Sequence, residues 1–160
     1  MSADLATIAP TFVEIAHRVV WCTVATVDRD DKPRTRILHP IWEWDGDALT
    51  GWILTSPISP KAEDLAAHPD ISLTYWDPSQ DVATAECATT WDDTPELREA
   101  GWRRFADGPA PVGYDPSIIP IWPNHEVPEF GVLRLHPYRL RAMPGSVLLT
   151  GQGETLTWSA

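Results

Sequence analysis

Apolar residues recur every three or four positions near the start of the chain, and this spacing predicts a helix over residues 4–18. An α-helix places such positions on one face, which gives an apolar stripe and a polar back. Pro10 lacks the backbone N–H of a helix interior, so we expect a bend or a restart there. The pattern is typical of a helix that covers one end of a barrel or sheet. The residues of the stripe are Leu5, Ile8, Phe12, Ile15 and Val19.

After residue 20 the pattern changes, and segments rich in Val, Ile, Thr and Trp alternate with polar turns. Acidic, Gly-containing or charged turns at 28–32 and 45–47 join the first three segments, which predicts an antiparallel meander. One face of the segment 82–91 carries only small residues, which leaves room for a ligand or for another backbone. The predicted strands span 21–28, 34–44, 48–54, 71–76, 82–91, 130–142, 147–150 and 156–158.

Two further helices are predicted where a capping residue directly precedes a proline. Ser59 and Thr94 occupy this position, at the start of helices predicted over 60–67 and about 94–105. Residues 108–128 hold six prolines but also many large apolar side chains. We therefore expect this Pro-rich loop to be an ordered excursion packed against a neighbouring surface, either of this chain or of another subunit.

These elements lack the regular strand–helix alternation of a parallel doubly wound sheet. The sequence therefore predicts one domain over residues 1–160, mainly β with attached helices, folded as an antiparallel barrel. The N-terminal helix, about 4–18, and the Pro-rich loop, about 108–128, are additions to this barrel. A chain of 160 residues is long enough to bury one hydrophobic core.

The charge of the chain argues against two classes of partner. Asp and Glu outnumber Lys and Arg by 23 to 12, which gives a formal net charge of −11 and a pI near 4.7. Nucleic acids and anionic lipid surfaces both select basic proteins, so we expect neither as a partner. No apolar run is as long as a membrane span, which needs about 18 residues, and no signal peptide is visible. The two cysteines, Cys22 and Cys87, indicate a reduced protein of the cytoplasm.

Motifs for metal binding or nucleophilic catalysis are missing from the sequence. The five histidines have no spacing typical of metal ligands, and no Ser, His and Asp arrangement typical of a catalytic triad is present. The sequence therefore predicts no metal site, and it identifies no catalytic side chain.

The strongest candidate for a binding site is the segment from Leu54 to Lys61, where a strand, a hydroxyl-rich loop and a helix start follow each other. Free N–H groups at a helix start favour an anion. Hydroxyl donors come from Thr55, Ser56 and Ser59, and Lys61 adds a full positive charge. These are the components of a phosphate site without a Gly-rich loop. The alternative is an ordinary helix cap beside a solvated lysine.

Two arginines extend this candidate site. Arg34 and Arg36 lie on one face of the second predicted strand, because residues two apart in a strand share a face. In a meander the second and third strands are neighbours, which would bring Arg36 near the start of the 55–61 loop. An arginine can bind phosphate through two parallel hydrogen bonds. The alternative is that both arginines are exposed charges, paired to Asp28 or Asp45.

Four short motifs follow one another along the chain: Ala25-Thr-Val-Asp28, Pro33-Arg-Thr-Arg36-Ile-Leu38, Thr55-Ser56…Ser59-Pro-Lys61 and His68-Pro69-Asp-Ile-Ser-Leu-Thr-Tyr75. Their order and spacing resemble the pyridoxamine 5′-phosphate oxidase-like superfamily of FMN-binding split barrels. The resemblance covers about residues 12–91 and continues weakly through 133–140 and the terminal strand with Trp158.

This resemblance implies a split barrel that forms a homodimer with two FMN sites at the subunit interface. The implied function is an oxidoreductase in which the flavin, through its N5 atom, transfers a hydride to or from an unknown small molecule. The strand that holds the flavin would contain Arg36, Ile37, Leu38 and His39, the last two beside the ring system. The loop that binds the phosphate would contain Thr55, Ser56, Ser59 and Lys61.

Two departures from the family pattern narrow this expectation. Family members often carry an arginine before the loop lysine, where this chain has Pro60, so part of the phosphate binding would shift to Arg34 or to backbone N–H groups. The C-terminal segment, residues 156–160, lacks the basic and histidine residues that hold the substrate phosphate in the oxidase itself. This argues against oxidation of vitamin B6.

Related groups bind the 8-hydroxy-5-deazaflavin coenzyme or haem instead of FMN. Because the acidic tail of the deazaflavin prefers a basic groove, the acidic composition of this chain favours FMN. The alternatives are a deazaflavin-dependent reductase and a non-catalytic flavin- or haem-binding protein.

Overall fold

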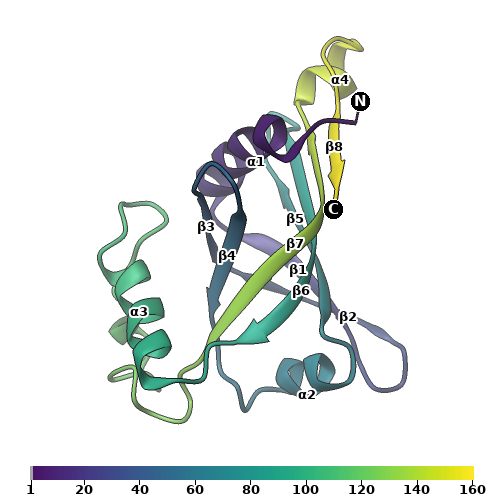
Figure 1. Cartoon of the computed structure of the whole chain (residues 1–160). Helices are drawn as coiled ribbons and strands as arrows, with labels where there is room; N and C mark the ends of the chain where they lie inside the picture. The colour runs from purple at the N-terminus through teal and green to yellow at the C-terminus, as the bar shows by residue number, and fades with distance from the viewer. Residues whose placement is uncertain (1) are drawn as a thin grey trace.

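Eight strands form one antiparallel sheet, which curls into a split barrel in a computed structural model that describes residues 2–160 (Figure 1). Their order along the sheet is β2-β1-β5-β6-β7-β4-β3, and β8 pairs with the C-terminal half of β7. The predicted fold class, mainly β with attached helices, is confirmed. The strands are β1 (Cys22–Val27), β2 (Pro33–Leu38), β3 (Pro40–Trp44), β4 (Leu49–Leu54), β5 (Asp70–Trp76), β6 (Val82–Trp91), β7 (Val132–Met143) and β8 (Leu156–Ser159).

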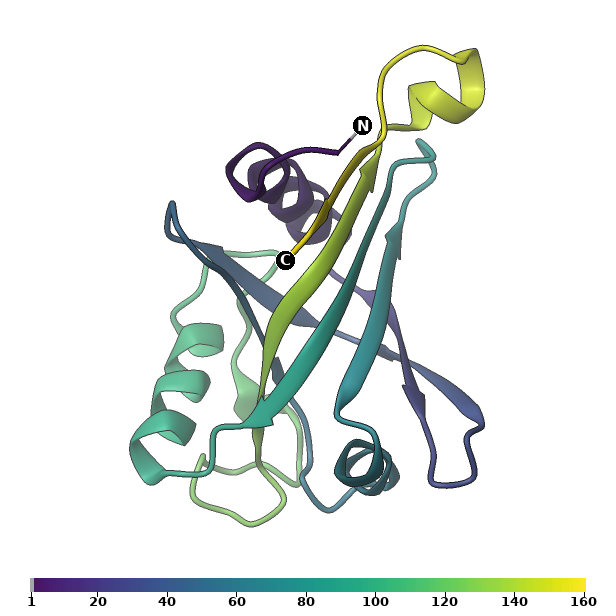
Figure 2. The same cartoon turned by 45° about the vertical axis from the view of Figure 1, so that its right-hand side comes forward.

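Helices lie at both ends and on one side of the barrel (Figures 1 and 2). In both views α1 (Leu5–Val19) covers the upper end, α2 (Pro60–Ala67) crosses the lower end, and α3 (Pro95–Ala106) stands beside β4 and β7. The three predicted helices are confirmed to within one or two residues, and the first is continuous through Pro10. The helices, in chain order, are α1 (Leu5–Val19), α2 (Pro60–Ala67), α3 (Pro95–Ala106) and α4 (Gly145–Thr150), with a 3-10 turn η1 (Pro116–Ile118).

The prediction of one long strand over 34–44 is wrong, because His39 interrupts it and separates β2 from β3. Up to that point β2 pairs with β1, whereas from Pro40 onward β3 pairs with β4. Pro40 has no N–H for a ladder and restricts the backbone of the residue before it, which gives the break a local cause. β2 and β3 thus lie at opposite ends of the hydrogen-bonded path, and the barrel is split between them. Arg36 is consequently not on a strand next to β4.

The main core is filled by α1 and the inner face of the sheet. Phe12 of α1 is fully buried and meets the Trp42 ring edge-on, with ring centroids 4.9 Å apart. The Trp42 indole N–H donates a 2.9 Å hydrogen bond to the hydroxyl of Tyr75, so the polar atoms of this pair satisfy each other. The small inward residues of β6, Ala83 and Ala85 among them, leave room for α1, which packs across them.

A second cluster lies between α3, β4 and the loop that follows α3. Its buried aromatic residues are Trp52, Phe105, Trp122 and Phe130, and the ring centroids of Trp122 and Phe130 are 5.5 Å apart. The Trp122 indole N–H donates to the Glu129 carbonyl oxygen at 2.9 Å. The Pro-rich loop is therefore an ordered excursion, as predicted, and it packs against its own chain.

The predicted strand over 147–150 is also wrong, because these residues belong to the short helix α4. Pro144 precedes this helix, and Gly151 ends it with a left-handed backbone, φ 69°. Apolar Val and Leu side chains fit either structure, and the turn residues on both sides decide between them. Within residues 2–160, no helix has both the length and the apolar character needed to cross a membrane.

Candidate functional site

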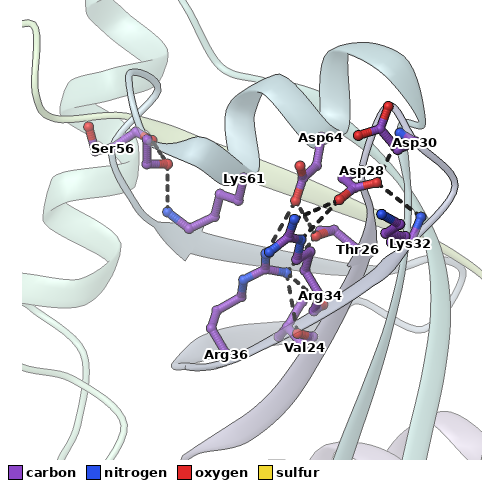
Figure 3. Close-up of polar contacts among 11 residues, drawn as sticks. Val24, Thr26, Asp28, Asp30, Lys32, Arg34, Arg36, Ser56, Lys61 and Asp64 are labelled. Carbon is purple, nitrogen blue, oxygen red and sulfur yellow. Dashed lines mark hydrogen bonds and ion pairs between the residues drawn. The ribbon is translucent and has the colours of Figure 1, made fainter.

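A cluster of charged and hydroxyl side chains lies where α2 crosses the lower end of the barrel (Figure 3). The hairpin of β1 and β2 supplies Thr26 and Arg36, and the N-cap and first turns of α2 supply Ser59, Lys61 and Asp64. We refer to these five residues as the polar cluster.

The start of α2 sets the position of Lys61. Ser59 is the N-cap residue, with extended backbone, and Pro60 takes the first helical position, as predicted. The Ser59 hydroxyl makes no capping bond to the helix. It donates a 2.7 Å hydrogen bond to the Ser56 carbonyl oxygen and accepts a 2.8 Å hydrogen bond from Lys61 Nζ. The helix start is left without a side-chain acceptor, and the lysine is folded back beside it.

Burial lowers the pKa of Lys61 below its ordinary value, and the nearby charge of Arg36 lowers it further. Loss of water and a like charge both destabilise an ammonium group, and a bound anion counteracts both effects. The proximity of these two cations therefore favours a negatively charged ligand, in a chain whose net charge is −11.

Arg36 is held by β1 and α2 through one part of its guanidinium. Nη1 donates to the Thr26 hydroxyl at 2.7 Å and lies 3.4 Å from the Val24 carbonyl oxygen, while Nη2 lies 3.4 Å from Asp64 Oδ2. The Thr26 hydroxyl itself donates to Asp64 Oδ2 at 2.7 Å. Thr26 and Asp64 are both buried, so water competes little for these bonds.

Arg34 shares a face of β2 with Arg36, as predicted, because the two residues pair with Thr26 and Val24 of β1. Its charge, however, is balanced inside the hairpin. Nε and Nη2 of Arg34 lie 3.0 and 2.9 Å from Asp28 Oδ2. Of the alternatives that the sequence left open for Arg34, pairing with Asp28 is the one observed.

Asp28 is the organising residue of the β1–β2 turn. Its other carboxylate oxygen accepts the backbone N–H groups of Asp30 and Lys32 at 2.9 and 3.0 Å. The Lys32 N–H contributes most to holding the pKa of Asp28 below its ordinary value, and Arg34 adds to this effect, against the opposing effect of burial. The turn thereby retains the Arg34 side chain.

A cavity of about 810 Å³ opens between this turn and α2. Three arginines and four carboxylates line it, including Arg36 and Asp64, so its charges nearly cancel. Lys61 is not part of its lining. The excess positive charge of the region therefore lies on the Lys61 side of Arg36.

The other residues predicted on β2 diverge from the polar cluster. Ile37 is 59% exposed on the outer face of the strand, and Leu38 packs against the main core. His39 is buried at the break between β2 and β3, where its ring lies 5.0 Å from that of Trp21 and 5.2 Å from that of Tyr114. Burial lowers the pKa of His39 below its ordinary value.

The hydroxyl residues of the 55–61 loop have separate roles. Thr55 is buried, and its N–H donates to the Gly131 carbonyl oxygen at 2.9 Å. Ser56 accepts the Ser59 hydroxyl with its carbonyl oxygen, while its own hydroxyl accepts the Ile58 N–H at 3.3 Å. The structure therefore joins Arg36, Lys61, Ser59 and Ser56 into one region and leaves His39 in another.

Sequence reasoning missed Thr26 and Asp64. A polar residue at the inward position that follows Cys22 and Val24 was a signal for Thr26, because β1 alternates and its inner positions are otherwise apolar. Asp64 follows Lys61 by three positions on α2, a spacing that keeps both near the helix start. In the part of the chain that the structure describes, no three His, Cys, Asp or Glu side chains form a group suited to a metal ion.

Comparison with known proteins first defines the class of fold. A pyridoxamine 5′-phosphate oxidase-related, FMN-binding protein from Nostoc punctiforme superposes with a TM-score of 0.64 and 19% identity, over 89% of this chain and 85% of that one. A haem-binding protein from Mycobacterium smegmatis gives 0.68 and 16% identity, over 98% of this chain and 58% of that one. A Clostridium acetobutylicum protein related to general stress protein 26, of the pyridoxinephosphate oxidase family, gives 0.69 and 13% identity, over 97% and 94%.

The sequence itself identifies the family. The family model described as pyridoxamine 5′-phosphate oxidase matches residues 8–117, which is more than half of the chain. The chain therefore belongs to the pyridoxamine 5′-phosphate oxidase family, and the resemblance seen in the motifs is confirmed. No curated protein matches this chain.

Proposed function

We propose that this protein binds FMN through the polar cluster and acts as an FMN-dependent oxidoreductase on a small molecule. The observation that carries the proposal is the partly buried Lys61 ammonium beside the Arg36 guanidinium at the start of α2. A phosphate monoester fits this arrangement, because it brings the negative charge that both cations and the helix start favour. The family membership and the FMN-binding neighbour from Nostoc punctiforme support the same cofactor.

The side chains in this proposal bind and orient the cofactor. Lys61 and Arg36 hold the phosphate by charge, and Ser59 and Ser56 line the loop beside it. Ile37, Leu38 and His39 continue the proposed flavin-binding segment, with Thr55 buried beneath the loop. FMN, when bound, supplies the hydride chemistry at its N5 atom, so no side-chain acid or base is required for the transfer. This agrees with the lack of a catalytic triad in the sequence.

A homodimer with the cofactor at its interface completes the proposal. Two apolar side chains next to cluster residues in sequence are exposed in the single chain: Ile37, beside Arg36, by 59%, and Ile58, beside Ser59, by 70%. Large exposed apolar side chains near a binding site favour a protein partner, here a second copy of the chain. Light scattering coupled to gel filtration measures this, and a monomer in the presence of FMN would contradict it.

We also place the protein in the cytoplasm. Cys22 and Cys87 are both buried and unpaired, which agrees with a reducing compartment. Localisation of the tagged full chain by fractionation tests this proposal.

A visible spectrum of the purified protein, recorded with and without added FMN, tests the cofactor. We expect a flavin band, and quenching of FMN fluorescence during titration. A Soret band would point to haem, and uptake of the 8-hydroxy-5-deazaflavin coenzyme in preference to FMN would point to the corresponding reductase. Either result would replace FMN in the proposal.

Lys61→Ala is expected to weaken FMN binding by about 1–3 kcal/mol, the range for hydrogen bonds to charged groups. The control is Lys32→Ala, which removes the same charge at the only other lysine of the chain, in the β1–β2 turn. Fluorescence titration measures both. An equal loss in the two variants would show a general effect of charge and not a phosphate contact.

Reduction of the FMN-loaded protein separates an enzyme from a carrier. NADPH is added in the absence of oxygen, and reoxidation is then followed with candidate acceptors. Bleaching of the flavin band by NADPH, with recovery on addition of an acceptor, is the expected result. A flavin that NADPH does not reduce would favour a non-catalytic flavin-binding protein.

A further inference from the structure

We infer that Thr26 is a positioning residue: its hydroxyl, backed by Asp64, holds Arg36 so that the Nε–Nη2 edge of the guanidinium is presented to the phosphate of the ligand. This inference rests on the proposed function of the polar cluster and adds a residue to it. Thr26 lies in the motif Ala25-Thr-Val-Asp28, but the sequence pattern assigns it no role in binding.

The first step concerns the two edges of Arg36. A guanidinium is planar and offers two pairs of parallel donors, Nη1 with Nη2 and Nε with Nη2. Thr26 Oγ1 and Asp64 Oδ2 lie 2.7 Å apart and contact Nη1 and Nη2 at 2.7 and 3.4 Å. These two oxygens therefore occupy the Nη1–Nη2 edge. Among residues 2–160 the hydrogen bonds of Arg36 all come from Nη1 and Nη2, which leaves the Nε–Nη2 edge open.

The second step concerns direction. In Figure 3 the hydrogen bonds of the guanidinium run toward Thr26, Asp64 and Val24, whereas Lys61 lies on the other side of the Arg36 side chain. The charge of Arg36 also acts on Lys61, so the two cations share one region. An anion bound between them meets the open edge of Arg36 and the ammonium of Lys61.

The third step explains why a hydroxyl is needed. Thr26 accepts from Arg36 and donates to Asp64 at the same time, and only a group that is both donor and acceptor can do this. Thr26 is 2% exposed, so its position is fixed by packing. A long arginine side chain loses much rotamer freedom on binding, and an arginine already fixed in place has less to lose.

The test uses Thr26→Val, which keeps the shape of the side chain and all charges but removes the hydroxyl. Thr26→Ser restores the hydroxyl. Thr23→Val is the matched control, since Thr23 is exposed on the other face of the same strand. Two properties are measured on the full chain: the NMR order parameter of the Arg36 Nε–H bond without ligand, and the affinity for inorganic phosphate and for FMN.

We expect Thr26→Val to reduce the order of Arg36 and to weaken phosphate binding by about tenfold. Thr26→Ser is expected to stay within about twofold of the parent protein, because it keeps both hydrogen bonds. In an Arg36→Ala background Thr26→Val is expected to have no further effect on affinity, because the side chain that it positions is gone. Thr26→Ala gives the same comparison if valine at this buried position prevents folding.

An unchanged order parameter of Arg36 in Thr26→Val would overturn the inference, whatever the affinity. So would an equal loss of affinity in the presence and absence of Arg36. If the parent protein binds neither phosphate nor FMN, the proposed function is wrong, while the order parameter still decides whether Thr26 positions Arg36.

Discussion

The polar cluster and the aromatic region next to α3 differ in whether their buried polar atoms have hydrogen-bond partners. In the polar cluster, the buried side-chain oxygens of Thr26 and Asp64 bond to each other and to Arg36. The aromatic region consists of the second cluster, between α3, β4 and the loop that follows α3, together with His39, whose ring lies 5.8 Å from that of Phe105. In this region His39 Nε2 and Trp52 Nε1 are buried without a hydrogen-bond partner among the residues that the structure describes. Arg104 lies over the face of the Trp52 ring, 3.6 Å from its centroid, and pairs with Glu43.

The polar cluster is thus organised around charged groups, whereas the aromatic region is organised around apolar packing. A buried polar atom without a partner is costly, and it is tolerated in the aromatic region because ring contacts supply the stability there. The five residues of the polar cluster include no large apolar side chain, and hydrogen bonds fix their geometry. Substitutions in the aromatic region should therefore change folding stability, and substitutions in the polar cluster should change ligand affinity.

Phe130→Ala gives the largest expected effect on stability. Phe130 is fully buried and packs against Trp102 and Trp122, so truncation leaves a cavity and should cost about 3–5 kcal/mol of unfolding free energy. Urea denaturation measures this. Phosphate affinity, determined below the unfolding transition, should remain that of the parent protein. A matching loss of affinity would show that the two regions are not independent.

The stability of the aromatic region should also depend on pH. Because burial lowers the pKa of His39 in the folded protein, the unfolded chain binds more protons than the folded chain below about pH 6.5. The stability that neutral His39 provides is thus complete above that pH and is lost as pH falls through the lowered pKa. His17, whose pKa burial also lowers, acts in the same direction.

His39→Leu should reduce the loss of stability between pH 7.5 and pH 5 without abolishing it, because His17 remains. Urea midpoints at the two pH values measure this. Identical pH dependence in the parent and the variant would show that His39 does not titrate with unfolding.

Arg34→Ala gives the smallest expected effect and distinguishes the two arginines of β2. Arg34 is largely exposed and its charge is taken up by Asp28, whereas Arg36 keeps an open edge. Exposed ion pairs add little to stability, so the urea midpoint should hardly move, and phosphate affinity should fall far less than in Lys61→Ala. A loss as large as that of Lys61→Ala would place the phosphate nearer to Arg34.

The sequence predicted most elements of the fold, and the errors have local causes. Helices marked by a cap and a proline, such as 60–67, were found to within a residue because their signals are local. The break at His39 was missed because the residues on both sides of Pro40 have a strand pattern. Only the pairing partners show that β2 and β3 lie at opposite edges of the sheet. The helix at 145–150 was missed because its apolar run fits two periods.

The candidate site was predictable as far as its charges and not as far as their partners. Lys61 follows Ser59 by two positions, so the loop alone placed them together. Which arginine is free depends on Asp28 and Asp64. Asp28 was among the partners that the sequence left open, whereas Asp64 lies far from Arg36 in sequence and gives no sign of the cation it will meet. The inward polar position of Thr26 in β1 was visible in the sequence, but its role was not, since that role exists only through contacts with Arg36 and Asp64.

One strand decides when the molecule can assemble. β7 pairs with β6, β4 and β8, and it is the only hydrogen-bonded connection, among the strands that the structure describes, between the β2-β1-β5-β6 half and the β4-β3 hairpin. During synthesis β7 leaves the ribosome after β1 to β6, so the two halves stay separate sheets with open edges until then. Long-range pairings of this kind form slowly, which exposes β4 and β6 to wrong partners in the nascent chain. Completion of residues 132–143 is therefore the event that commits the chain to its barrel.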